Sequence, residues 1–269
     1  MANEREKELA GRAAAKLVVD GDIVGLGTGS TAYFAVVAIG ERVKAGLKIV
    51  GVPTSEATAD LAHKLGIPLS TLEDHPEIDI TIDGADEVDP HLNLIKGGGG
   101  ALLREKVVAS VTKKMVVVAD STKLVPTLGK FPLPVEIIPF ARPVVERKIV
   151  ILGATPKLRL KPDGQPFVTD NGNYILDCSF GKIGNPAAVA RELSETVGVV
   201  EHGLFIGFAK LAIVGKGSVV RQIRAKQSPA SPRDRRPRLS GRGKPGNRPQ
   251  PARAERSRPK RKPQRRRRS

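Results

Sequence analysis

Hydrophobic residues recur along the first half of the chain with two periods, one typical of strands and one typical of helices. Short apolar runs with strand character occupy residues 22–26, 47–52, 78–82 and 115–119. Between them, the spacing of apolar residues predicts helices over residues 31–45, 55–65 and 101–113. Strands that alternate with helices of this length are typical of a largely parallel sheet covered by helices. This part of the sequence therefore predicts an α/β fold.

A further helix precedes the first strand. Its apolar residues Leu9, Ala13 and Leu17 have the spacing of one helix face. Asn3 and Glu6 are three residues apart, the spacing of a capping box, in which two side chains satisfy free N–H groups at a helix start. We therefore expect this helix to begin at Asn3.

The second half has a different pattern. Five prolines between residues 126 and 143 mark a crossover. A smaller α+β unit follows, with strands at 134–138, 156–160 and 174–178 and helices near 141–152 and 186–196. Two more apolar strands, 203–208 and 211–215, have the character to return to the first sheet, although the sequence leaves this open. We predict one domain of residues 1–130 and 204–227, and a smaller domain of residues 131–203.

Composition changes sharply after Gln227. Residues 228–269 hold 17 Lys and Arg against two acidic residues, a net charge of +15, whereas residues 1–227 hold 28 basic and 26 acidic residues. Such a segment buries too little apolar surface to offset its chain entropy, so we expect it to be disordered. Its charge suits electrostatic binding of nucleic acid, but it has no aromatic residue for base stacking. We favour an appended extension without a catalytic role.

Several features limit the classes of function. A single cysteine, Cys178, excludes a disulfide within the chain, and its apolar strand favours a small core residue over a nucleophile. The charged N-terminus does not resemble a signal peptide, and no apolar run has the length of a membrane span, so we predict a cytoplasmic protein. The histidines show no metal-ligand spacing, and we predict no metal and no cofactor. They are His63, His75, His91 and His202.

A glycine-rich turn, Gly25–Thr31, lies between the first strand and the helix after it. Backbone N–H groups at such a helix start bind anions, and Thr28, Ser30 and Thr31 add hydroxyl donors, so we expect phosphate here. A dinucleotide site would need glycine where Ser30 stands, and an acidic residue about 20 positions further on. Pro53–Ser55 occupies that neighbourhood, which disfavours a nicotinamide cofactor. The alternative is a turn with a structural role only.

Two carboxylates, Asp83 and Asp86, follow the strand at 78–82. This places them at the carboxyl edge of the sheet, where open α/β folds bind ligands. Paired carboxylates can divide the proton transfers on hydroxyl groups that sugar isomerisation requires. The alternatives are a solvated acidic turn or a Ca²⁺ or Mg²⁺ site, although the oxygen ligands of an EF-hand loop are missing.

A third loop, Lys96–Gly100, leads into the helix that holds Glu105. Four glycines cost conformational entropy unless the backbone must approach a partner closely. Glu105 facing inward would have a raised pKa, which suits a base that takes a carbon-bound proton, and Lys96 would stabilise the charge on an enediolate oxygen. The alternative places Glu105 on a wet helix face between Arg104 and Lys106. Lys123, after the strand at 115–119, adds a point charge for phosphate.

The order and spacing of these motifs resemble type A ribose-5-phosphate isomerase of the pentose phosphate pathway. The resemblance rests on GLGTGST (25–31), TIDGADEVDP (81–90), LIKGGGGALLREK (94–106), ADSTKLV (119–125) and LGKFPLPVEI (128–137). It continues through DNGNYILDC (170–178) and GVVEHGLFIG (198–207), so it covers residues 1–220. No catalytic motif departs from the family pattern, and only the basic tail is foreign to it.

The resemblance implies a Rossmann-like main domain with a smaller inserted ferredoxin-like domain, in a metal-free homodimer or tetramer. It implies interconversion of ribose 5-phosphate and ribulose 5-phosphate. Glu105 would move the proton between C1 and C2, Asp83 and Asp86 would handle hydroxyl protons and ring opening, and Lys96 would lie at the reacting oxygens. Substrate binding would involve Asp83, Asp86 and Lys96 together with Thr28, Gly29, Ser30, Thr31, Gly84, Ala85, Gly97, Gly98, Gly99, Lys123 and Lys7.

Two functions of other classes compete with this interpretation. A sugar-phosphate-sensing regulator on the same fold would need a DNA-reading module ahead of the sensor domain. The phosphate loop begins at Gly25, which leaves space for one helix before it. The other competitor is a nucleic-acid-binding protein that acts through the tail.

Overall fold

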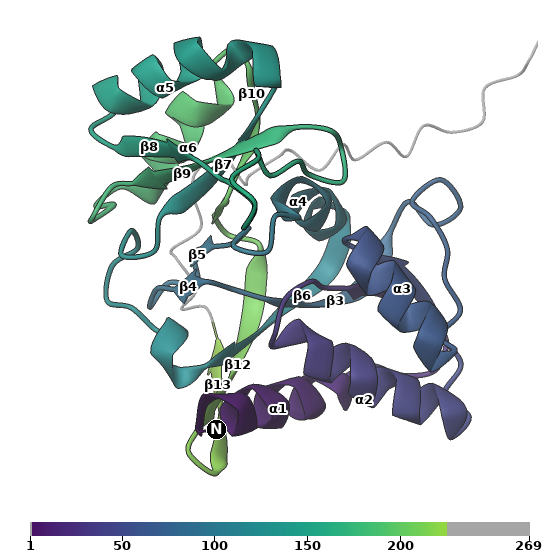
Figure 1. Ribbon diagram of the computed structural model, residues 1–269. Helices are drawn as coiled ribbons and strands as arrows, with labels where there is room; N and C mark the ends of the chain where they lie inside the picture. The colour runs from purple at the N-terminus through teal and green to yellow at the C-terminus, as the bar shows by residue number, and fades with distance from the viewer. Residues whose placement is uncertain (1, 225–269) are drawn as a thin grey trace, which may run out of the picture. The chain divides into compact units, whose positions relative to one another are not determined.

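A six-stranded sheet forms the centre of the computed structural model, which describes residues 2–224 (Figure 1). The strand order is β13-β12-β6-β3-β1-β2, with five parallel strands and β13 antiparallel at one edge. The strands are β1 (Ile23–Leu26), β2 (Val50–Pro53), β3 (Ile78–Gly84), β6 (Thr112–Asp120), β12 (Ala209–Lys216) and β13 (Val219–Arg224). Of the last two apolar strands, the one predicted at 211–215 does return to the first sheet, within β12, whereas the one predicted at 203–208 contains β11 (Leu204–Phe205), which belongs to a separate three-stranded sheet. The chain order reverses between β1 and β3, which makes their carboxyl ends the switch point of the sheet.

Helices cover both faces of this sheet, and strand β6 shows why. Its side chains alternate between the two faces: Val116 and Val118 enter the core beneath three helices, while Met115 and Val117 enter the opposite core. The three helices are α1 (Ala2–Ala15), α2 (Ala32–Lys44) and α3 (Glu56–Leu65). Helix α4 (Leu102–Ser110) lies on the opposite face, between the central sheet and the smaller sheet (Figure 1).

A four-stranded antiparallel sheet, in the order β10-β7-β9-β8, carries the two remaining α-helices of the described chain. In sequence its elements are β7 (Leu133–Ile137), α5 (Arg142–Ile151), β8 (Thr155–Leu158), β9 (Tyr174–Ser179), α6 (Pro186–Ser194) and β10 (Val199–His202). This β-α-β-β-α-β order is the ferredoxin-like arrangement that the sequence predicted. Cys178 is fully buried in its core, as expected for a small apolar residue.

Three very short strands join the two larger sheets. They are β4 (Glu87–Val88), β5 (Leu94–Ile95) and β11 (Leu204–Phe205), antiparallel in the order β11-β5-β4. Two 3₁₀ turns, Ser121–Lys123 and Pro139–Ala141, follow β6 and β7. Within the described residues no helix is long and apolar enough to cross a membrane.

Some sequence-based expectations were wrong. Asn3 and Glu6 do not form the predicted capping box, because α1 already includes Ala2. The Glu6 carboxylate instead accepts hydrogen bonds from Ser121 N (3.0 Å) and Gly217 N (2.7 Å). These contacts, the Gly217 bond foremost, hold the pKa of Glu6 below its ordinary value.

The limits of several elements also differ. The helix predicted to reach residue 113 ends at Ser110, since β6 begins at Thr112, and β2 begins at Val50 rather than at residue 47. Strand β10 was not foreseen as a strand. The domain limits at residues 130 and 204 remain a prediction, and the predicted disorder of residues 228–269 falls outside the described part of the chain.

Candidate active site

The loops after β1 and β3 meet at the switch point of the sheet. Thr28 N in the first loop donates to Asp83 Oδ1 at the end of β3 over 3.1 Å. Helix α2 starts directly after Thr31, so its free N–H groups face the same place. From α1, the Lys7 ammonium donates to Ser30 Oγ at 3.0 Å. The segment Thr28–Thr31 therefore combines helix N–H groups and hydroxyls, which together suit a phosphate.

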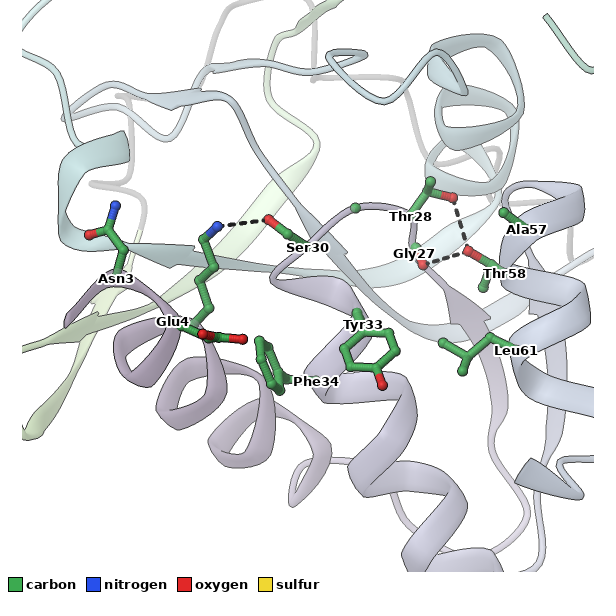
Figure 2. A pocket seen from close by; sticks show the side chains of 12 residues that line it. Asn3, Glu4, Gly27, Thr28, Ser30, Tyr33, Phe34, Ala57, Thr58 and Leu61 are labelled. Atoms are coloured by element: carbon green, nitrogen blue, oxygen red, sulfur yellow. Dashed lines mark hydrogen bonds between the residues drawn. The ribbon is translucent and has the colours of Figure 1, made fainter. Parts of the chain in front are cut away.

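The Thr28 hydroxyl is fixed by a cluster of other hydroxyls that we did not assign to the site from the sequence. Its Oγ1 lies 2.7 Å from Thr54 Oγ1, 2.8 Å from Ser55 Oγ and 3.2 Å from Thr58 Oγ1. Figure 2 shows Thr28 and Thr58 side by side, with Thr58 also donating to Gly27 O. The available signal was the run of hydroxyl residues directly after β2, which ends at the same sheet edge as β1.

Lys96 occupies the centre of a buried ionic cluster. Its Nζ lies 2.9 Å from Asp83 Oδ2 and 3.4 Å from Glu105 Oε2, and donates to Gly84 O at 2.6 Å. The side chains of Asp83, Lys96 and Glu105 are 0%, 2% and 4% exposed. Asp83 Oδ1 also accepts from Gly84 N at 2.7 Å. Loops that are distant in sequence thus converge on one ammonium group.

Burial controls the protonation of this cluster. It raises the pKa of Glu105 to about 8, against the pull of Lys96 and with the help of Asp83 and Asp86. Burial also raises the pKa of Asp83, although Lys96 opposes the rise. For Lys96, burial by itself lowers the pKa, but the carboxylates of Asp83 and Glu105 outweigh it and hold the pKa above its ordinary value. Glu105 is therefore a carboxyl group that exchanges its proton near neutral pH.

One cleft brings the predicted site residues together. All thirteen of its lining residues belong to the set predicted from the sequence: Thr28, Gly29, Ser30, Thr31, Gly84, Ala85, Asp86, Lys96, Gly97, Gly98, Gly99, Glu105 and Lys123. The phosphate loop and the Glu105 carboxyl group thus face the same space. Lys123 follows β6 in a turn that Asp120 caps by accepting from Thr122 N at 3.0 Å.

Two predicted residues do not line this cleft. Asp83 lies beneath it as the partner of Lys96. Lys7 reaches Ser30 from a second cavity of about 620 Å³, on the other side of the Gly27–Ser30 loop. Tyr33, Phe34 and Leu61 form apolar walls of that cavity (Figure 2).

The structure decides one alternative that the sequence left open, the environment of Glu105. Glu105 does not lie on a wet helix face, because both it and Lys106 are buried. Among residues 2–224 there is no group of three or more His, Cys, Asp or Glu residues that suits a metal ion. The acidic loop is instead bound to protein partners, with Asp86 Oδ2 accepting from Gly98 N at 2.8 Å.

Comparison with known proteins now identifies the family. The family described as ribose 5-phosphate isomerase A, or phosphoriboisomerase A, matches residues 50–218. The chain belongs to this family. Ribose-5-phosphate isomerase A of Parvibaculum lavamentivorans is 56% identical over 216 residues, which cover 78% of this chain and 94% of that protein. Ribose-5-phosphate isomerase A of Synechococcus is 51% identical over 221 residues, which cover 81% of this chain and 96% of that protein.

Solved structures of ribose 5-phosphate isomerases have the same fold. One in complex with phospho-erythronic acid is 40% identical, with a TM-score of 0.81, and covers 83% of this chain and 100% of its own. That of ribose 5 phosphate isomerase A from Neisseria gonorrhoeae is 39% identical, with a TM-score of 0.79, over 84% of this chain and 100% of its own. The resemblance and the fold class predicted from the sequence are confirmed.

The raised pKa of Glu105 predicts a pH-dependent contribution to stability. Between its ordinary value of 4.5 and about 8 the folded chain holds this proton more tightly than the unfolded chain does, so stability from this group falls as pH rises through that window. Glu105→Gln removes the effect. Urea unfolding at a series of pH values should therefore show the variant gaining stability relative to the unmodified chain up to pH of about 8. Glu73→Gln, at an exposed glutamate, is the control, and identical pH profiles for both variants would contradict the assignment.

Proposed function

We propose that the chain interconverts D-ribose 5-phosphate and D-ribulose 5-phosphate, as an aldose–ketose isomerase of the non-oxidative branch of the pentose phosphate pathway. Membership of the family supports this proposal. The observation that carries it is the shared cleft, in which the anion-binding turn Thr28–Thr31 faces a buried carboxyl group, Glu105, whose pKa is raised to about 8. One end of the cleft suits a phosphate, and the other suits proton transfer at carbon.

The chemistry follows from this arrangement. With the phosphate at Ser30, Thr31 and Lys123, the carbonyl end of an open-chain pentose extends toward Glu105 and Lys96. The Glu105 carboxylate takes the proton from C2 of the aldose, and the electron pair of that C–H bond forms a C1–C2 double bond while the carbonyl electrons move to O1. The Lys96 ammonium stabilises the resulting enediolate oxygen. Glu105 then returns the proton to C1, and a hydroxyl proton moves from O2 to O1.

The two aspartates have different environments, and we assign them different tasks. Asp86 lines the cleft, so it is in place to exchange protons with sugar hydroxyls. Asp83 is fully buried, accepts from two backbone N–H groups and pairs with Lys96. It acts through Lys96, by keeping that ammonium charged and in position, rather than by direct contact with the sugar.

A ligand of a relative supports the same placement. The solved structure with a TM-score of 0.81 contains phospho-erythronic acid. This compound joins a phosphate ester to a carboxylate, and a carboxylate carries the negative charge that an enediolate develops at the reacting oxygens. A cleft with an anion site at one end and an ammonium group at the other fits both groups.

We also propose that the chain forms a homodimer in the cytoplasm, as the resemblance implies. Exposed apolar side chains gather on the smaller sheet unit, where Ile138 N donates to Gly198 O at 3.0 Å and joins two neighbouring segments. Phe140 is 94% exposed and Val197 is 88% exposed there. An apolar patch of this kind is typical of a subunit interface.

Phe140→Asp is expected to convert a dimer into a monomer, because it places a charge in the patch. Sedimentation velocity measures the change. Val219→Asp introduces the same charge at an exposed position on β13, where it should leave the assembly intact. A Phe140→Asp protein that still sediments as a dimer would place the interface elsewhere.

Glu105→Gln should lower kcat by about 10²- to 10⁴-fold, the usual effect of removing an acid–base group, while ribose 5-phosphate still binds. Turnover followed by ketose formation and binding followed by calorimetry separate the two effects. In the unmodified enzyme kcat/KM should fall below pH of about 8 as Glu105 takes up a proton. Glu73→Gln serves as the matched control, and near-normal turnover of Glu105→Gln would remove Glu105 from the reaction.

Asp83→Asn and Asp86→Asn test the division of tasks. Both are expected to lower kcat. Asp83 raises the pKa of Lys96 more than Asp86 does, so the basic limb of the pH–kcat profile should move further toward low pH in Asp83→Asn. An equal shift of the basic limb in the two variants would show that Asp83 does not raise the pKa of Lys96 more than Asp86 does.

A further inference from the structure

A side chain of the smaller sheet unit holds the glycine loop of the cleft. Arg159, directly after β8, donates from Nη1 to Gly97 O at 3.0 Å and to Gly98 O at 3.2 Å. Its side chain is 14% exposed. Arg159 follows the loop by about 60 residues, and no feature of its local sequence indicates this contact.

Arg159 is itself held firmly. Its Nε donates to Asp177 Oδ2 at 2.9 Å and its Nη2 pairs with the second oxygen of that carboxylate, so the pair is bidentate. The guanidinium also lies 5.8 Å from the ring centre of Phe167. That ring packs against Gly100, where an added Cβ would lie 2.5 Å from it. The smaller unit therefore supports the loop at two points.

The geometry of the peptide group transmits this contact to the cleft. In a trans peptide the C=O of one residue and the N–H of the next point in opposite directions. With Gly97 O directed at Arg159, the N–H of Gly98 points away from it and donates to Asp86 Oδ2 at 2.8 Å. With Gly98 O directed the same way, the N–H of Gly99 points away from Arg159, and Gly99 itself lines the cleft. The approach is close, since a Cβ on Gly98 would lie 2.6 Å from Asp86 Oδ1.

We propose that Arg159, held by Asp177, is a positioning residue for the isomerisation. It fixes two successive peptide groups of the glycine loop so that one N–H holds Asp86 and the next is presented to a substrate oxygen. The inference rests on the proposed function, because it concerns the reacting end of the same cleft. It gives the smaller unit a part in the reaction, although Glu105, Asp83, Asp86 and Lys96 all lie outside it.

The test separates the two ends of the cleft. Inorganic phosphate, used as a competitive inhibitor, probes the turn Thr28–Thr31 and Lys123, which Arg159 does not touch. Arg159→Met should lower kcat by about 10- to 100-fold, the cost of misplacing reacting groups by about 1 Å, while the inhibition constant of phosphate stays unchanged. Arg159→Lys keeps the charge but not the planar fork, so its kcat should lie between those of Arg159→Met and the unmodified enzyme.

Hydrogen exchange gives a second measurement that does not depend on turnover. Amides of residues 97–100 should exchange faster in Arg159→Met, with Arg159→Lys between the two. Lys161→Met removes an equal charge from an exposed side chain two residues further on, and should alter neither kcat nor exchange. Thermal melts followed by circular dichroism identify any variant that fails to fold. If Arg159→Met does not fold, Arg159→Lys is compared with the unmodified enzyme in its place.

Two outcomes would overturn the inference. One is an Arg159→Met enzyme with normal kcat and normal exchange at residues 97–100. The other is a phosphate inhibition constant that rises by the same factor as kcat falls, since that would indicate a disturbance of the whole cleft rather than of the glycine loop alone. If the unmodified chain shows no isomerisation, the proposed function fails, and the exchange comparison still decides whether Arg159 fixes the loop.

Discussion

The site depends on one buried ammonium group shared by two carboxyl groups. Burying an ion costs several kcal/mol of solvation free energy unless protein partners replace the water. Burying all three groups of this cluster in their charged forms would therefore be costly. Asp83 has the better partners, with two backbone N–H groups and Lys96 at 2.9 Å, whereas Glu105 has Lys96 at 3.4 Å. A single ammonium neutralises a single carboxylate, so Glu105 retains its proton to a higher pH. Burial raises the pKa of Glu105, and its pairing with Lys96 does not offset the rise, so the cleft holds a group able to take and return a proton under ordinary conditions.

Each member of this cluster is delivered by a different element, and the fold determines where they meet. Asp83 lies at the end of β3 beside the switch point, and Glu105 lies in the first turn of α4. Lys96 directly follows β5, a strand of two residues that pairs with β4 and β11. Its backbone N–H donates to Gly203 O at 2.9 Å. The three-stranded sheet, which has little core of its own, thus places the ammonium. The centre of the Phe205 ring in β11 lies 5.5 Å from Lys96 Nζ.

The sequence predicts what depends on local pattern and fails where a distant partner decides. Strand periodicity followed by glycines, carboxylates and hydroxyls placed Thr28–Thr31, Asp86 and Lys123 at one sheet edge, because the parallel strands β1, β3 and β6 end on the same side. That rule does not place Lys96 and the glycine loop, which follow β5 of the antiparallel three-stranded sheet. Glu6 was misinterpreted as a helix cap because its partners, Ser121 and Gly217, lie more than 100 residues away. Arg159 lies inside the strand predicted at 156–160 and was not singled out from the sequence, because its partners are the carbonyl groups of the distant Gly97 and Gly98. Contacts between the central sheet and the smaller sheet join residues that are distant in the sequence, so no local periodicity indicates them.

The Arg104–Lys106 triplet shows how such distant contacts serve the reaction. Consecutive residues of a helix point in directions about 100° apart, so no two of the three side chains share a partner. Arg104 donates to Glu56 of α3 at 2.6 Å, Glu105 faces Lys96, and Lys106 donates to Glu201 of β10 at 2.7 Å. A helix of nine residues is marginal by itself, so its orientation must come from tertiary contacts. The largely buried Lys106–Glu201 pair and the buried side chains of Leu102 and Val108 hold the rotation of α4 and therefore the direction in which the Glu105 carboxyl group points. The Arg104–Glu56 pair lies at the surface and adds little.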